Sequence, residues 1–410
     1  MRYDEENPGW APSAGASVGT VPVRAPAPVA GDTADDALLR DVRRRMAGGG
    51  ASEVRSALAG AGRLLGSEAL DELSRRARAE LFGAGPLQAL LETPGVTDVL
   101  VNGPSDVWID RGRGIERTQV DLGTPAAVRA LAVRLAAAGR ARLDDASPVV
   151  DARLPDGTRL HAIVSPVCAE GAVISLRVLR RRALTLDQLV SSGTVPVEWA
   201  GLVQGLVAGR ANLIVSGGTG TGKTTLLAAL LSLVPRDERI VCVEEARELV
   251  PDHPHVVPLT ARRANVEGAG AVDLPVLVRA SLRMRPDRIV LGECRGAEVR
   301  DVLMAMNTGH DGSSATLHAN AASQVVPRLE ALGSLAGMTR EAVWAQTAGA
   351  LDVVLHLRRR AGRRWISEVG VTARSPDGAA AVVAVATWDG EGGVVGSEGW
   401  SALSERWAPR

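Results

Sequence analysis

The sequence predicts an α/β protein in which a mostly parallel sheet, covered by helices on both faces, follows a smaller α+β domain. Over residues 186–362, short apolar runs alternate with helical patterns, as expected for parallel strands joined by helices. One of these runs leads directly into a glycine-rich loop and then into a helical pattern. The 410 residues, 46% of them apolar, are enough to form a core in about two or three domains.

The chain before residue 84 is expected to consist of a tail and a helical extension. Residues 1–34 are rich in Pro, Ala and Gly without a hydrophobic period, which predicts a disordered tail. Residues 35–83 are interpreted as a helical extension, in which residues 67–81 place apolar side chains along one helix face. The basic face of that helix is interpreted as solvated, rather than as a membrane or partner contact.

Residues 84–180 predict the small α+β domain. A helix is expected over residues 124–139, and strands are expected over residues 96–101, 107–110, 149–154, 159–164 and 174–179. The segment Pro155-Asp156-Gly157-Thr158 lies between two of these strands and is typical of a hairpin turn. Three consecutive arginines then precede a new helical pattern, which predicts an interdomain linker over residues 181–185.

Residues 186–362 predict the parallel sheet. Its strands are expected over residues 212–216, 239–243, 256–259, 288–291, 313–317 and 353–357. The remaining residues, 363–410, indicate further strands over 366–371 and 380–387 and a polar end, with no role assigned.

Composition excludes several classes of protein. Basic and acidic residues cancel at 47 each and aromatics make up 2%, which disfavours direct binding of nucleic acid. The three cysteines form no C-x-x-C pair, which argues against a zinc ribbon and a disulfide framework. The acidic start lacks a secretory pattern, and no apolar run approaches the ~20 residues of a membrane span. A cytoplasmic protein is therefore expected.

The glycine-rich loop has the sequence pattern of a phosphate cradle. It follows an apolar strand, precedes a helix and fits G-x-x-x-x-G-K-[ST]. In such loops, backbone N–H groups and the helix N-terminus hold phosphates, and the hydroxyl after the lysine can ligate Mg²⁺. The predicted nucleotide-binding residues are Gly217, Gly218, Thr219, Gly220, Thr221, Gly222, Lys223, Thr224 and Thr225.

Lys223 is the only lysine in the chain, since the other 46 of the 47 basic residues are arginines. Arginine replaces lysine at most solvated surface positions, but its planar fork is no substitute for a compact ammonium that must reach a phosphate. The one retained lysine falls on the lysine of the motif, so we expect it to contact the β- and γ-phosphates.

Carboxylates and histidines downstream supply candidate catalytic groups. Glu244 and Glu293 each follow an apolar strand, and the carboxyl ends of strands are where open α/β sheets bind ligands. His310 and His318 flank a third short strand. His318 is interpreted as a sensor that donates to a γ-phosphate or to Glu293. Many arginines are also candidates for stabilising phosphoryl charge, and their number leaves the choice open.

Four ordered motifs resemble those of the ATPases of type II and type IV secretion systems and type IV pili. They are the loop at 217–225 (a Walker A motif), the acidic pair Glu244-Glu245, a degenerate Walker B ending at Glu293, and a histidine box over 309–320. Within that family, the sequence is most similar to the Tad/CpaF branch, which drives tight-adherence (Flp) pili. The similar stretches are residues 85–87, 101–103, 150–157, 259–270, 282–288 and 305–312.

The resemblance implies a RecA-like ATPase domain preceded by a PAS-like domain. It further implies a homohexamer that uses ATP and Mg²⁺ and binds pilus or secretion platform proteins at the inner face of the cell membrane. By the same carry-over, Glu244 activates water, Glu293 holds the metal directly or through water with Thr224, and His318 senses the nucleotide. Arg177 matches an arginine that faces the nucleotide from the N-terminal domain.

Departures from the family pattern keep alternatives open. The acidic pair is Glu-Glu where Glu-Asp is usual, and the residues after 362 match little. A type II zinc module, a guanine-specificity motif and an ABC signature are absent from the sequence. The main expectation is a motor for Tad pilus assembly. The alternatives are a type IV or conjugal-transfer ATPase and, from another class, a nucleotide-switched scaffold with little turnover.

Overall fold

The computed structural model describes residue 58 and residues 67–112, 114–178, 183–262, 269–375 and 378–407. The predicted tail over residues 1–34 and most of the predicted extension before residue 67 lie outside the described residues. The chain divides into two compact units, Met1–Leu179 and Arg180–Arg410. Among the described helices, none has the length and apolar character needed to cross a bilayer.

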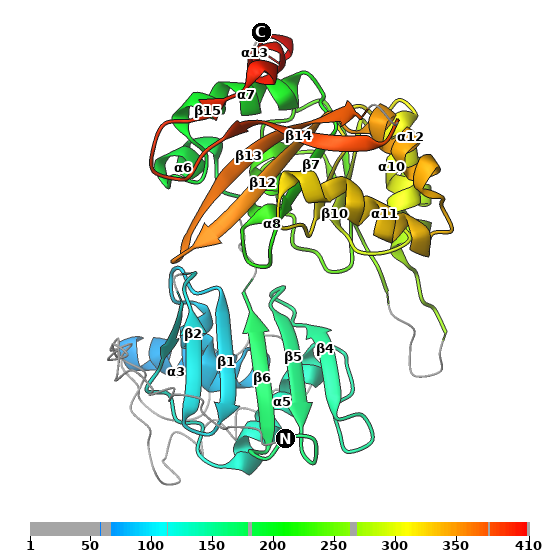
Figure 1. Cartoon of the computed structure of the whole chain (residues 1–410). Helices are drawn as coiled ribbons and strands as arrows, with labels where there is room; N and C mark the ends of the chain where they lie inside the picture. Colours follow the sequence, from blue (N-terminus) through cyan, green and yellow to red (C-terminus); the bar gives the residue numbers. More distant parts are fainter. Residues whose placement is uncertain are drawn as a thin grey trace, which may run out of the picture. The chain divides into compact units, whose positions relative to one another are not determined.

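The first unit contains an antiparallel sheet of six strands in the order β3-β2-β1-β6-β5-β4 (Figure 1). The strands are β1 (Asp98–Gly103), β2 (Asp106–Asp110), β3 (Ile115–Arg117), β4 (Val149–Arg153), β5 (Arg159–Val164) and β6 (Ala172–Arg177). Its helical elements are α3 (Ser67–Phe82), η2 (Gly85–Leu87), α4 (Gln88–Leu91) and α5 (Pro125–Ala138). Every strand expected in this region is present, and β3, only three residues long, is the one that was not anticipated.

One face of this sheet is buried under α5. Burial alternates along β5, so that Leu160, Ala162 and Val164 lie inside, and α5 contributes Val128 and Leu135 to the same core. The predicted hairpin joins β4 to β5: Asp156 Oδ1 accepts the N–H of Thr158 at 2.9 Å, and Gly157 has φ 93°. The turn residues therefore fix the strand pairing as their sequence indicates.

The second unit contains a sheet of nine strands in the order β15-β14-β13-β12-β7-β11-β10-β8-β9. The parallel strands are β7 (Leu213–Gly217), β8 (Ile240–Glu244), β9 (Val256–Thr260), β10 (Arg288–Cys294), β11 (Ser314–Leu317) and β12 (Val353–Arg360). Three antiparallel strands complete the sheet, namely β13 (Arg363–Arg374), β14 (Ala380–Thr387) and β15 (Val395–Gly396). The segment after residue 362 therefore continues the same sheet.

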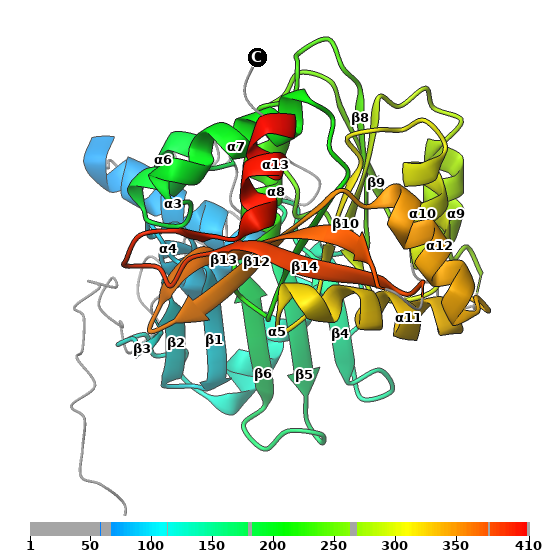
Figure 2. The ribbon, with the colours of Figure 1, turned by 45° about the horizontal axis from the view of Figure 1, so that its top comes forward.

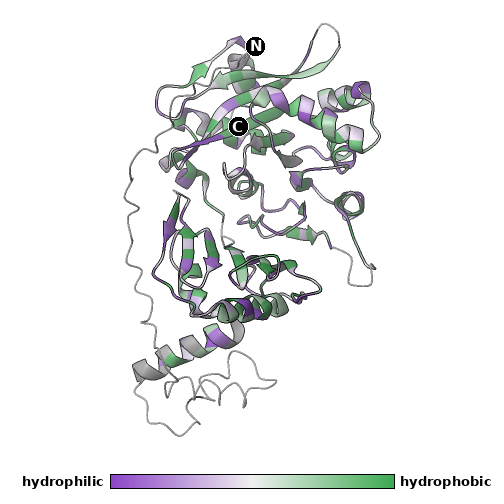
Figure 3. Ribbon diagram, turned by 60° about the horizontal axis from the view of Figure 1, so that its bottom comes forward, coloured by the Kyte–Doolittle hydropathy of each residue, from purple (hydrophilic) through white to green (hydrophobic). Residues whose placement is uncertain are grey.

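Helices cover both faces of this sheet (Figures 1 and 2). Successive residues of β7 point to opposite faces, so that Leu213 and Val215 join one core and Ile214 joins the other. The first core is closed by α6 (Leu186–Ser191), α7 (Val197–Ala208), α8 (Lys223–Leu231) and α13 (Glu398–Arg406). The second is closed by α9 (Leu274–Ser281), α10 (Val299–Asn307), η3 (Ala322–Gln324), α11 (Val325–Leu335) and α12 (Arg340–Ala350). In Figure 3 the helix ribbons carry both polar and apolar residues, as expected for amphipathic helices that pack one face on a sheet.

The C-terminal helix α13 lies beside α7 and completes the first of these cores (Figure 2). Trp407 is 8% exposed, and its ring lies so close to Gly209 that a Cβ built there would be 2.6 Å from ring atoms. Trp400 packs on Trp199 with ring centroids 6.0 Å apart, and Arg406 pairs with Asp352 at 2.9 Å. Helix α13 and Trp407 are therefore part of the packed core of this unit.

We predict that Trp407→Ala lowers the free energy of unfolding by about 3 kcal/mol, because it leaves a cavity between α7 and α13. Glu405→Ala removes an exposed side chain from the same helix and is expected to change stability by less than about 0.5 kcal/mol. Urea denaturation of both variants tests this prediction. Equal stability of the two variants would show that the terminal helix does not support the core.

Candidate functional site

The parallel register brings four chain segments to one edge of the second sheet. Ser216, near the end of β7, pairs with Leu317 of β11, while Leu291 of β10 pairs with both Ala315 and Val243. The carboxyl ends of β7, β8, β10 and β11 therefore lie side by side. This edge is where open parallel sheets bind ligands.

The glycine loop leaves this edge and enters α8 with the backbone shape of a phosphate cradle. Gly217 has φ 150°, and a Cβ there would lie 2.6 Å from the backbone oxygen of Leu357. Gly222, the residue before α8, has φ 96°, a conformation that only glycine adopts at little cost. The helix begins at Lys223 with no acidic residue in its first turn, so its N-terminus keeps a field that attracts anions.

The ammonium of Lys223 is folded back onto the loop. Its Nζ donates to the backbone oxygens of Gly217 at 3.1 Å and Gly218 at 3.0 Å, and lies 3.3 Å from Nε2 of His318. The residue is only 8% exposed, and this burial lowers the pKa of its ammonium, an effect that the Glu293 carboxylate opposes. The loop thus holds a partly dehydrated cation at its centre, a condition that strengthens attraction to a phosphate.

His318 connects the loop to the carboxylate of Glu293. Its Nε2 lies 2.5 Å from Oε1 of Glu293 as well as 3.3 Å from Lys223 Nζ. One ring nitrogen cannot donate to the carboxylate and accept from the ammonium at the same time. The proton on Nε2 therefore decides which of the two residues His318 bonds.

Glu293 is held on its other side by an arginine that the sequence did not single out from many. Arg295 Nη2 forms an ion pair with Oε2 of Glu293, and Arg295 Nη1 lies 3.3 Å from Oε2 of Glu245. Lys223, His318, Glu293, Arg295 and Glu245 thus form a continuous chain of charged and polar groups at the sheet edge. Both acids of the Glu-Glu pair reach this region.

Glu244 is buried at the end of β8. It is 3% exposed, and its Oε1 accepts the backbone N–H groups of Glu248 at 2.8 Å and Leu249 at 2.9 Å. A Cβ at position 292 would lie 2.7 Å from Cγ of Glu244, so Gly292 is required for the carboxylate to reach this place beside β10. The glycine before Glu293 therefore has a packing role that the motif alone does not reveal.

The residues at this edge fit a Mg²⁺ ion bound together with phosphates. Thr224 is half-buried in the first turn of α8, next to Lys223, and Glu293 belongs to the adjoining polar chain. Within the described residues there is no group of three or more His, Cys, Asp or Glu side chains able to hold a metal by themselves. Mg²⁺ usually takes one or two protein ligands and completes its shell with phosphates and water, so this arrangement suits it.

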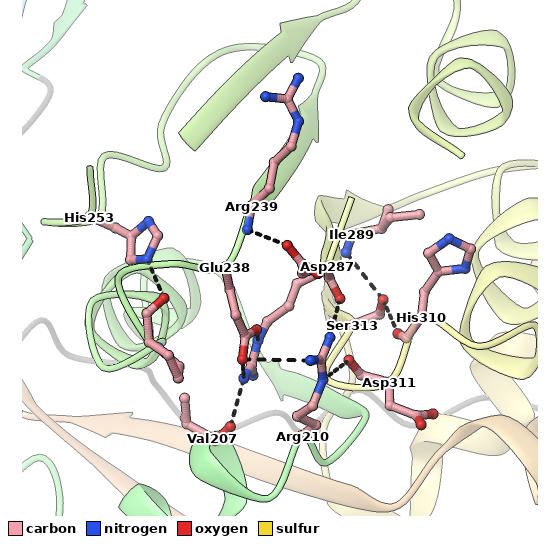
Figure 4. A network of polar contacts seen from close by, with 12 residues as sticks. Val207, Arg210, Glu238, Arg239, His253, Asp287, Ile289, His310, Asp311 and Ser313 are labelled. Atoms are coloured by element: carbon pink, nitrogen blue, oxygen red, sulfur yellow. Dashed lines mark hydrogen bonds and ion pairs between the residues drawn. The ribbon is translucent and has the colours of Figure 1, made fainter. Parts of the chain in front are cut away.

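His310 lies away from this cluster, contrary to the prediction that it joins the site. It precedes β11, so it lies at the amino-terminal edge of the sheet, where Ser313 Oγ donates to its backbone oxygen at 2.6 Å (Figure 4). Around it, Arg210 donates to the backbone oxygens of Asp287 and Asp311. Residues that flank a strand emerge at opposite sheet edges, which separates His310 from His318.

Arg177 belongs to the first unit. It lies at the end of β6, where its Nε donates to Oδ1 of Asp98 at 3.0 Å. Its side chain is 56% exposed. Its proposed action on a nucleotide stays a prediction.

Two further polar contacts join neighbouring strands near this edge. His356, buried in β12, bonds through Nδ1 to Oγ of Ser216 at 2.9 Å, and burial lowers its pKa. Thr316 Oγ1 donates to the backbone oxygen of Gly292 at 2.5 Å. The sequence contained one signal for the first of these contacts. His356 is the polar residue in the otherwise apolar run Val353 to Leu357, and this run pairs with β7, the strand before the loop.

We predict that Glu293→Gln lowers the pKa of His318 further. Burial and the Lys223 ammonium already lower this pKa from its ordinary value of 6.5, and the Glu293 carboxylate acts in the opposite direction. Removing that carboxylate leaves only the lowering effects of these neighbours. NMR titration of the His318 ring, assigned with His318→Gln, measures the change, and Arg236→Gln serves as a surface control. An unchanged or raised pKa would contradict the assigned ion pair.

Comparison with known proteins assigns the chain to a family. Residues 80–382 match the family described as type II/IV secretion system protein. A Mycobacterium tuberculosis (strain CDC 1551) protein described as a conjugal transfer protein is 51% identical over 322 residues, which cover 77% of this chain and 91% of that protein. The type IV secretion system protein VirB11 of Brucella suis is 30% identical over 280 residues, covering 62% and 78%.

A solved structure, the VirB11 ATPase of the Brucella suis type IV secretion system with sulphate, covers 70% of this chain and 95% of that one. Its identity is 28% and its TM-score is 0.37. The family match alone spans well over half of the residues. The chain belongs to the type II/IV secretion system protein family.

Proposed function

We propose that the second unit binds Mg-ATP and hydrolyses it, and that this turnover drives a secretion machine of the type IV or conjugal-transfer kind. The observation that carries the proposal is the buried Lys223 ammonium, folded onto its glycine loop and adjoining His318 and Glu293. Such a site provides phosphate binding, a metal-orienting carboxylate and a proton-carrying group in one place.

In this proposal the glycine loop binds the phosphates of the nucleotide. Lys223 exchanges the backbone oxygens of Gly217 and Gly218 for phosphate oxygens, and backbone N–H groups of the loop complete the contact. Thr224 and Glu293 hold the Mg²⁺ ion, which when bound neutralises charge that develops on the phosphates.

In this proposal Glu244 then acts on the attacking water, and His318 responds to whether a phosphate occupies the loop. Glu244, fixed by two backbone N–H groups, orients or deprotonates the attacking water. When a phosphate draws Lys223 away, His318 loses one of its two neighbours and keeps Glu293. The position of the His318 proton therefore follows the occupancy of the loop.

The relatives favour the type IV and conjugal kind of machine over the Tad pilus. The Mycobacterium tuberculosis relative is described as a conjugal transfer protein, and VirB11 as a type IV secretion protein. Our expectation of a Tad motor receives no separate support from these names.

Tad pilus assembly stays a second candidate because of particular stretches of sequence. The sequence resembles that of the Tad/CpaF branch over residues 259–270, 282–288 and 305–312. The genes beside this one distinguish the cargoes: two polytopic membrane proteins with a small pilin-like peptide indicate a pilus, and a relaxase or coupling protein indicates conjugal transfer. In either case we propose a homohexamer that meets membrane partners from the cytoplasmic side.

We predict that Lys223→Arg lowers the rate of ATP hydrolysis by at least about 100-fold without unfolding the protein. The guanidinium keeps the charge but cannot occupy the compact position of the ammonium inside the loop. Steady-state phosphate release measures the rate, and circular dichroism checks folding. Arg236→Lys, the reverse exchange at an exposed position, is the matched control and should retain wild-type turnover. Near-normal turnover of Lys223→Arg would contradict the proposed role.

The scaffold alternative predicts nucleotide binding with little turnover. Glu293→Gln separates the two functions, because it removes the metal-orienting charge and keeps the loop. A motor loses Mg²⁺-dependent turnover in this variant and still binds ADP. If the wild-type protein binds ADP but its Mg²⁺-dependent turnover is no higher than that of Glu293→Gln, the scaffold alternative is favoured.

A further inference from the structure

The hairpin formed by β12 and β13 concentrates positive charge beside the glycine loop. Residues 358–364 contain five arginines, on either side of a two-residue turn. The turn residues Ala361 and Gly362 both have positive φ, 47° and 81°, as the tightest hairpins require. The charge is therefore held on a defined two-stranded ribbon (Figure 1).

Two arginines of this hairpin lie against the loop itself. Arg359 and Arg364 are cross-strand partners, so they occupy the same face of the ribbon. Arg364 Nε donates to the backbone oxygen of Gly220 at 2.9 Å, and its Cδ lies 3.4 Å from the place of a Cβ on Gly222. A Cβ on Gly220 would lie 3.0 Å from Nη1 of Arg359. Both side chains thus reach the segment that leads into α8.

The order of strands assigns the two flanks of the loop to different parts of a nucleotide. On one flank β11 brings His318, which lies next to Lys223 and Glu293 and so marks the γ-phosphate end. On the other flank β12 pairs with β7 and brings the arginine hairpin. A polyphosphate that lies across the loop with its γ end toward β11 directs its α-phosphate and nucleoside toward β12.

There is room for a nucleoside on that flank. A cavity of about 860 Å³ is lined by loop residues, including Thr219 and Thr221, and by hairpin residues, including Arg359 and Trp365. This size lies within the range of small-molecule sites, about 300–1,000 Å³. The Trp365 ring is held by an Nε1 bond to the backbone oxygen of Trp388 and by contact with Gly390. Trp365 pairs with Arg358 across the hairpin, so its ring lies on the ribbon face opposite that of Arg359 and Arg364. The guanidinium plane of Arg359 is a surface on which a nucleobase can stack.

We infer that the β12–β13 hairpin forms the nucleoside-binding side of the nucleotide site, an inference that rests on the proposed function. There Arg359 contacts the α-phosphate and base of a nucleoside di- or triphosphate. Arg364 supports the loop through the Gly220 carbonyl and acts as a positioning residue. The hairpin thereby makes the site prefer nucleotides to bare polyphosphate. The strands that follow the P-loop core take part in ligand recognition as well as in folding.

Isothermal titration of the full-length protein with Mg-ADP and with magnesium pyrophosphate tests this inference. Pyrophosphate fills the β- and γ-phosphate positions beside Lys223 but has neither an α-phosphate nor a nucleoside. We expect Arg359→Gln to weaken ADP binding about tenfold or more, the effect of losing a charge-assisted hydrogen bond, and to change pyrophosphate binding less than about threefold. Arg359→Lys, which keeps the charge without the plane, should fall between. Arg236→Gln, an exposed arginine outside the cavity, is the matched control.

The outcomes separate this inference from the function on which it rests. If Arg359→Gln leaves both affinities unchanged, or weakens both equally, the hairpin is not the nucleoside side, although the nucleotide site stands. If the wild-type protein binds neither ligand, the nucleotide site itself is wrong and the inference falls with it. Thermal denaturation confirms that each variant is folded before it is titrated.

Discussion

The placement of one ammonium at the carboxyl edge of a parallel sheet is the constraint on which the rest of the site depends. Lys223 lies inside its loop because Gly217 and Gly222 adopt positive-φ conformations that other residues rarely reach, and because α8 begins at this lysine. The parallel register then delivers His318 and Glu293 beside it. A slip of one residue in β11 would turn Leu317 out of the core and carry His318 away.

The same sheet gives the loop two unlike sides. The β11 side carries a histidine and carboxylates that can exchange a proton, whereas the β12 side carries arginines whose charge is permanent. Burial of β7 on both faces fixes the loop between these sides. Strands β13 and β14 extend the sheet on the β12 side, and helix α13 packs on the core that these strands share.

Local patterns predicted much of this structure, and long-range pairing accounts for what they left out. The loop from Gly217 to Thr225 and its flanking strand and helix were predictable because glycine spacing and apolar runs act within a few residues. Glu244, Glu293 and His318 were expected at one edge from their positions after strands. His310 was misplaced because a residue before a strand and one after it emerge at opposite edges. The contact of Arg364 with Gly220, 144 residues away along the chain, leaves no trace in local sequence.

The single lysine also makes the central claim directly measurable. Protein labelled with ¹⁵N and ¹³C only in lysine gives one set of side-chain signals, since the chain contains no lysine other than Lys223. If the ammonium leaves the carbonyls of Gly217 and Gly218 for a phosphate, Mg-ADP will shift the Nζ and Cε signals of Lys223 in a saturable manner. Signals that stay unchanged while another method detects ADP binding would contradict the account.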